Sequence, residues 1–152
     1  MVEKDAVIER QHYKGLAWVA SMALFMQSLD ATILNTALPT IATDLQTPVF
    51  EMQMAIIAYS LAVALFIPLT AWAAAKFGTL TVFRSAVFTF VFGSVACAMA
   101  TSLETLVLAR ILQGIGGAFM MPVARLAIIQ TVPKNQLINA WNLMATAGLI
   151  GP

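Results

Sequence analysis

The stretch ETLVLARILQGIGGAFMMPVARLAIIQ, residues 104–130, is an apolar block that carries Arg110 near its start and several glycines beyond it. A helix of about 20 apolar residues crosses the roughly 30 Å hydrocarbon core of a bilayer, and this block is long enough to do so. It therefore predicts a membrane-spanning helix with a charged residue inside it. A charge at that depth is costly, so it usually faces the interior of a bundle, a partner or water.

Four more segments of this kind lie along the chain, separated by short stretches with proline, glycine or charge. They cover about residues 15–38, 52–74, 83–101 and 138 to the end, where the fifth is cut short. The chain of 152 residues is 61% hydrophobic and 10% charged, a balance that suits the bilayer better than water. The sequence predicts an all-α, polytopic transmembrane helix bundle of about four complete helices plus the start of a fifth, with a polar tail at residues 1–14.

Local signals indicate where two helices begin and where two bend. Thr101 and Glu104 have the spacing of a capping box, which would start the fourth helix. Pro48 suits the first position of the second helix, because its missing N–H loses no hydrogen bond there. Pro68 and Pro122 interrupt the second and fourth segments, where a missing donor bends a helix.

The basic residues are distributed unevenly between the two sides of an alternating topology. Lysine and arginine near the ends of spans are retained on the cytoplasmic side. Seven of the eight basic residues fall on one side, with Arg110 as the exception, so we expect a cytoplasmic N-terminus in the plasma (cell inner) membrane. The seven are Lys4, Arg10, Lys14, Lys76, Arg84, Arg125 and Lys134.

Several functional classes find no support in the sequence. The net charge is +1 and the basic residues form no run, so nucleic acid is not expected as a partner. The lone histidine, His12, lies in the polar tail, and the lone cysteine, Cys97, has no disulfide partner and is interpreted as a packing residue. Without a histidine cluster, a nucleophile elbow or metal-ligand spacing, we predict no enzyme, no metal and no cofactor.

Asp30 and Arg110 are ionisable residues inside the apolar segments. If the first span ends at Leu38 and the fourth begins at Glu104, they lie roughly 12 Å and 9 Å below the outer surface. Opposite charges at similar depth could form a pair, or could alternate with a proton and a substrate. The alternative is that both side chains reach the outer interface and act as anchors. We favour the first interpretation, because aspartate is too short to reach far.

One stripe of the fourth segment combines the charge with residues that lack a side chain. Arg110, Gln113 or Gly114, Gly117 and Met121 recur at three- and four-residue spacing. Glycine lets a neighbouring backbone come close, and plain helix packing is a sufficient explanation for at least one of the glycines. We expect this stripe to face the interior of the bundle.

A motif in the first segment resembles a known family. LDATILNTALP, residues 29–39, is similar to the first-helix signature of the major facilitator superfamily, specifically of its 14-helix drug/proton antiporters. Asp30 and Asn35 are its polar members, and Pro39 closes it. The resemblance implies the N-terminal part of a transporter fold, in which residues 15–152 would form helices 1 to 5 of the first half.

A second motif, in the fourth segment, supports the same family. LARILQGIGGA, residues 108–118, is similar to the fourth-helix motif of these antiporters. Its R-x-x-Q-G core falls on Arg110, Gln113 and Gly114, and Gly117 lies one turn further on. In the family this arginine is associated with proton transfer, so the resemblance implies that Asp30 and Arg110 carry proton coupling.

The end of the chain contributes a third, incomplete motif. GLIGP, residues 148–152, resembles the start of the fifth-helix antiporter motif, in which a glycine-proline stretch shapes the interface between the two halves. The matching residues here are Gly148, Gly151 and Pro152. Whether the parent has 12 or 14 helices stays open.

The connection between the second and third segments departs from the family pattern. The family usually has G-x-x-A-D-R-x-G-R-[RK], whereas this chain reads AWAAAKFGTLT at residues 71–81. Lys76 and Gly78 survive, but Ala75 replaces the aspartate, so most of the charged latch attributed to this loop is absent. Either the gate is built differently or this copy is impaired.

The resemblance implies export of hydrophobic or cationic small molecules in exchange for protons, with the proton gradient as the energy source. The expected partners are the lipid bilayer, the substrate, protons and the remainder of a transporter chain, because about four and a half helices cannot enclose a site between two halves. The alternative is a truncated membrane interaction protein that docks on other membrane proteins through its glycine stripe.

Overall fold

The computed structural model describes residues 2–132, 137–138, 141–142 and 146. Helices account for the regular structure of this part of the chain, so the predicted all-α class is confirmed. The five helices within these residues are α1 (Val2–Asp44), α2 (Val49–Phe66), α3 (Leu69–Phe77), α4 (Thr79–Ala98) and α5 (Leu103–Thr131).

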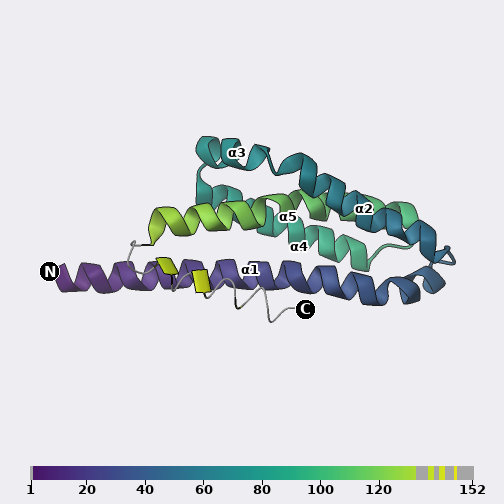
Figure 1. Ribbon diagram of the computed structural model, residues 1–152, viewed down its shortest axis with the longest axis horizontal. Coiled ribbons are helices and arrows are strands. Elements are labelled where there is room, and N and C mark those ends of the chain that lie inside the picture. Colours follow the sequence, from purple (N-terminus) through teal and green to yellow (C-terminus); the bar gives the residue numbers. More distant parts are fainter. Residues whose placement is uncertain (1, 133–136, 139–140, 143–145, 147–152) are drawn as a thin grey trace.

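The helices form an elongated bundle in which α5 is the central element. Figure 1 shows α1 as a long rod along one side and α3 continuing from α2; α1 packs against α5 and α2, while α4 packs against α5. The beginning of α1, the α3–α4 connection and the end of α5 share one end of the bundle (Figure 1). At that end, Thr79 Oγ1 at the start of α4 donates a hydrogen bond of 2.8 Å to Gln130 Oε1 near the end of α5. The connections therefore alternate between the two ends, as a polytopic bundle requires.

Glycines on α5 and α4 allow the backbones to approach closely. A Cβ built on Gly116 would lie 2.6 Å from the backbone nitrogen of Phe90 on α4, and one on Gly114 would lie 2.7 Å from the carbonyl oxygen of Tyr59 on α2. On α4, a Cβ at Gly93 would lie 2.8 Å from Gln113. No side chain fits at such distances, so these glycines permit α2 and α4 to pack directly on α5.

The exposure of the large apolar side chains indicates lipid as the surrounding medium. Phe50, Phe88 and Leu65 are mostly exposed, up to 80% for Phe50, while α5 is the most buried of the described helices. Three of these helices, α2, α4 and α5, are long and apolar enough to cross a membrane. An apolar surface of this extent is unfavourable in water and favourable in hydrocarbon.

The end of the first helix differs from the prediction. We expected the first span to end at Leu38, but α1 continues through Pro39 to Asp44. Proline removes only its own N–H from the helical ladder, and a long helix tolerates the loss of that one bond to the fourth preceding carbonyl. The chain then turns at Gln46, whose positive φ of 52° lies in the left-handed region.

The expected bends and starts of the next helices are partly correct. Pro68 divides the second segment into α2 and α3, whereas α5 continues through Pro122. Pro48 precedes the first residue of α2 instead of occupying it. The capping box of α5 is formed by Ser102 and Thr105 and not by Thr101 and Glu104, because Ser102 is the extended residue at which the helix begins.

Most of the fifth predicted segment lies outside the described residues. This applies to Gly148, Gly151 and Pro152 of the incomplete fifth-helix motif and to Lys134 among the basic residues. The predictions for the fifth-helix motif and for Lys134 therefore stay predictions.

We expect Gly116→Ala to lower the stability of the bundle. Alanine is the better helix former by about 1 kcal/mol, but overpacking against backbone atoms costs roughly 1–3 kcal/mol. Chemical unfolding in micelles, followed by helical circular dichroism, measures the difference. Ala75→Gly, at an exposed position of α3, is the control for helix propensity. An unfolding midpoint raised by Gly116→Ala would contradict the close-contact explanation.

Candidate functional site

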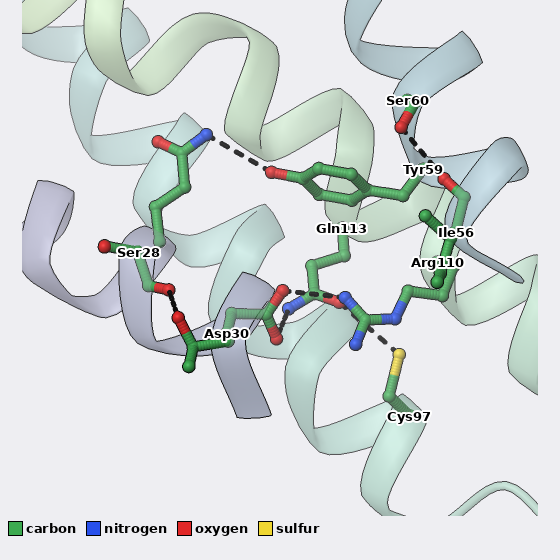
Figure 2. A network of polar contacts seen from close by, with 10 residues as sticks. Ser28, Asp30, Ile56, Tyr59, Ser60, Cys97, Arg110 and Gln113 are labelled. Carbon is green, nitrogen blue, oxygen red and sulfur yellow. Dashed lines mark hydrogen bonds and ion pairs between the residues drawn. The ribbon is translucent and has the colours of Figure 1, made fainter. Parts of the chain in front are cut away.

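Asp30 on α1 and Arg110 on α5 form an ion pair inside the bundle. Arg110 Nη1 lies 2.7 Å from Asp30 Oδ2. The other carboxylate oxygen, Oδ1, accepts a hydrogen bond of 2.7 Å from Gln113 Nε2. Figure 2 shows both side chains of α5 directed at the one carboxylate. The two residues that the sequence singled out are thus in direct contact, and Gln113 completes the group.

The three side chains are withdrawn from the surface of the bundle. Gln113 is fully buried and Arg110 is 4% exposed, while the side chain of Asp30 is 16% exposed. Two opposite charges in apolar surroundings stabilise each other when they are close and well hydrogen-bonded, whereas either charge alone would be strongly unfavourable. Asp30 is therefore the more accessible member of a neutral pair.

The predicted inward stripe on α5 is correct from Arg110 to Gly117, about two turns, and wrong at its end. Gly114 and Gly117 are buried beside Arg110, as expected. Met121, however, is 42% exposed, and Met120 is fully buried instead. The residue that follows Gly117 on the buried face is three positions further on, at Met120, and not four positions further on, at Met121. An α-helix has 3.6 residues per turn, so spacings of three and four residues alternate along one face.

Cys97 on α4 has a partner that the sequence did not reveal. Its Sγ lies 3.5 Å from Gln113 Oε1 and donates to it (Figure 2). Gln113 thus accepts from α4 through its oxygen and donates to α1 through its nitrogen. This fixes which way the amide points, since only the nitrogen can donate to a carboxylate. The interpretation of Cys97 as a packing residue alone was incomplete.

A second polar group lies next to the ion pair. Gln27 Nε2 on α1 lies 3.2 Å from the Tyr59 hydroxyl on α2 and 3.5 Å from the Gly117 carbonyl oxygen on α5. The ring of Tyr59 faces Arg110, with 5.9 Å from the guanidinium carbon Cζ to the ring centroid. A Cβ at Gly117 would lie 2.8 Å from the Tyr59 hydroxyl, so glycine leaves the space that this hydroxyl occupies.

Sequence reasoning did not identify Gln27 and Tyr59, although a signal was present. Gln27 lies three residues before Asp30 and therefore on nearly the same helix face, and Tyr59 is the one hydroxylated aromatic residue of its apolar segment. Within the described residues, two buried polar atoms of this region have no hydrogen-bond partner: Gln27 Oε1 and Arg110 Nε. An unused acceptor and an unused donor beside an ion pair are places where a water or a ligand could bind.

The remaining residues of the family motifs lie apart from the ion pair. Asn35 and Pro39 are exposed on α1, one turn apart. Lys76 is in the last turn of α3 and Gly78 ends that helix with a positive φ of 84°, a conformation that favours glycine. Among the described residues, no three acidic, histidine or cysteine side chains are placed to hold a metal ion.

The site balances the single negative charge of Asp30 against the positive charge of Arg110. A proton bound by Asp30 would cancel its charge and leave the guanidinium of Arg110 buried without a counterion, because arginine stays charged. The bond from Gln113 would also weaken, since hydrogen bonds to a charged acceptor are the stronger ones. Protonation of one carboxylate would therefore loosen α1 from α5.

Comparison with known proteins identifies the family. The family model described as Major Facilitator Superfamily matches residues 20–152. The chain belongs to the Major Facilitator Superfamily. Its fold is therefore the N-terminal part of the fold of this family of membrane transporters, and the chain is a multi-pass membrane protein. No solved structure matches the chain.

Two named relatives illustrate the similarity. "Probable transport protein HsrA" of Haemophilus influenzae is 84% identical over 144 residues, which are 95% of this chain and 31% of the relative. "Putative multidrug resistance protein MdtD" of Salmonella typhi is 44% identical over 135 residues, 89% of this chain and 29% of the relative. The chain thus spans about a third of the length of these relatives.

The ion pair predicts strong coupling between its two members. We expect Asp30→Asn and Arg110→Met to lower the free energy of unfolding by about 3–5 kcal/mol each, because each leaves one buried charge unpaired. The double variant should be closer to the wild type than either single one. Unfolding curves of all four proteins in micelles provide the double-mutant cycle. Additive losses would show that the two charges do not stabilise each other.

Proposed function

We propose that this chain is the N-terminal part of a transporter that exports hydrophobic or cationic small molecules in exchange for protons. The observation that carries the proposal is the buried pair of Asp30 and Arg110, reinforced by Gln113. An ionisable pair is expensive to keep at membrane depth and is most readily explained by a role in ion or substrate movement.

In this proposal, a proton and a cationic substrate alternate at Asp30. The unprotonated carboxylate holds Arg110 and Gln113, which keeps α1 against α5. Proton uptake releases Arg110, whose guanidinium already lies over the ring of Tyr59 and can stay there in a cation–π contact. Loss of the proton restores the charge that attracts Arg110 or a cationic substrate. Each exchange changes the contact between the same two helices.

The names of the two relatives support transport of small molecules. One is named a probable transport protein and the other a putative multidrug resistance protein. The distribution of basic residues supports a cytoplasmic N-terminus in the inner membrane: Lys76, Arg84 and Arg125 belong to helix ends that lie where α1 begins (Figure 1). In that orientation the proton-sensitive pair lies nearer the opposite, outer end.

The remainder of a transporter is required for this activity. The chain corresponds to 31% of one relative and 29% of the other. Asp30 is the more exposed member of the pair and would face substrate from one wall of a path. The opposite wall would come from helices beyond those described, since transporters of this kind bind substrate between repeats.

The alternative function, a membrane interaction protein, required a free glycine surface on the fourth segment, and that surface is occupied within the chain. Its proposed docking surface was the glycine stripe of the fourth segment. Gly114 and Gly117 contact Tyr59 of α2, and Gly116 contacts Phe90 of α4, so the stripe is used inside the chain. We therefore retain transport as the proposed function.

For Asp30, we expect the change to asparagine to abolish proton-driven efflux while membrane insertion remains intact. Asparagine keeps an oxygen for Gln113 but cannot bind and release a proton. The assay uses everted vesicles with a chimera in which this chain replaces the 144 matching residues of the Haemophilus influenzae relative. Asp44→Asn, at the exposed end of α1, is the matched control. Unchanged proton-dependent efflux in the Asp30 variant would remove this residue from the mechanism.

For Arg110, we expect alanine to reduce efflux more than lysine does, and lysine to reduce it below wild type. Lysine keeps the charge but loses the planar fork that reaches Asp30 beside the bond from Gln113. The same vesicles report the initial rates, and Arg84→Ala at an exposed position controls for the general loss of an arginine. Wild-type rates in both Arg110 variants would contradict a role for this residue.

A further inference from the structure

An open groove of about 300 Å³ lies between α3, α4 and α5, away from the ion pair. Its walls are mainly apolar and include Phe77, Val82, Ala86, Ile115 and Phe119. The hydroxyls of two further lining residues are already used: Ser85 Oγ bonds to the Val82 carbonyl at 2.9 Å and Thr89 Oγ1 to the Ser85 carbonyl at 2.8 Å. The groove thus offers a hydrocarbon-like surface along its length.

The length of the groove is comparable to the hydrocarbon thickness of one membrane leaflet. It begins near Phe77, at the end of α3, and is lined along α4 from Thr81 to Thr89. The eight helical steps from Thr81 to Thr89 span about 12 Å. One leaflet contributes roughly 15 Å of hydrocarbon, half the thickness of the apolar core. A chain lying in the groove would therefore extend from the interface toward the middle of the bilayer.

Lys76 lies outside the groove but beside Phe77, the lining residue at its mouth. Lys76 Nζ lies 4.9 Å from the centroid of the Trp72 ring and 5.4 Å from that of Phe77. The two rings meet edge to face at 6.0 Å. Arg84 is exposed on α4, one turn beyond Thr81. Tryptophan and basic residues are typical of the level of lipid headgroups, so the mouth is positively charged at the depth of the phosphates.

We propose that this groove binds a phospholipid with an anionic headgroup. The headgroup phosphate lies against Lys76, whose position is fixed by the two rings, and one acyl chain fills the groove beside Phe77. Charge complementarity at the mouth and an apolar wall of one leaflet's depth select this occupant. In this chain Ala75 stands beside Lys76, so no carboxylate at that position competes for the ammonium group.

Native mass spectrometry of the 152-residue chain in micelles tests the proposal. The chain is titrated with phosphatidylglycerol or with phosphatidylcholine of identical acyl chains. We expect retention of phosphatidylglycerol at lower concentrations than phosphatidylcholine. Soluble glycerol phosphate, which has the anionic group without the chains, should not displace the bound lipid.

Two variants separate the headgroup from the acyl chain. Lys76→Gln should weaken phosphatidylglycerol binding about fivefold and leave phosphatidylcholine unchanged. Its control, Arg125→Gln, removes one positive charge from α5 outside the groove. Ser85→Phe should fill the groove and weaken both lipids. Its control, Ser60→Phe, changes an exposed serine that likewise bonds to its own helix. Circular dichroism verifies that all four proteins keep their helical content.

Four outcomes would overturn the proposal. Equal affinity for the two lipids, or equal effects of Lys76→Gln and Arg125→Gln, would mean that no specific headgroup contact exists. Displacement by glycerol phosphate would indicate a phosphate site without an acyl chain. Retention of neither lipid would show that the groove does not bind a phospholipid.

Discussion

The constraint that governs this bundle is that a carboxylate and a guanidinium must meet within hydrocarbon. Asp30 and Arg110 come from helices at opposite ends of the described sequence, and their contact at 2.7 Å fixes how far α1 can slide or rotate against α5. Gln113 narrows that freedom further because it holds the second carboxylate oxygen. A shift by one residue along either helix would separate the charges and leave both in an apolar medium.

The central helix, α5, contacts α1 through polar side chains and contacts α2 and α4 at its glycines. Toward α1 it presents Arg110 and Gln113, toward α2 it presents Gly114 and Gly117, and toward α4 it presents Gly116. The polar contacts to α1 depend on charge and protonation. The glycine contacts to α2 and α4 depend only on shape. Chemical change at the site therefore acts first on the contact between α5 and α1, and it can reach α4 through the Cys97 bond to Gln113 and α2 through the ring of Tyr59.

The sequence predicted residue types and depths better than helix rotations and ends. The contact between Asp30 and Arg110 could be anticipated, because charged residues in apolar segments must find partners. The contact made by Cys97 could not, since its partner depends on how α4 turns about its axis. Pro39 misled the prediction of the first helix end, because a helix can continue through a proline when its remaining hydrogen bonds hold.

The backbone contacts at Gly114 and Gly116 have a mechanical consequence. Side chains can change rotamer and let two helices slide, whereas main-chain atoms in contact have no such freedom. Helices α2, α4 and α5 should therefore move as one rigid body. Any change of shape within the described residues would then be absorbed at the margins of that body: where α1 lies against it, and at Pro68, where the chain leaves α2 and begins α3.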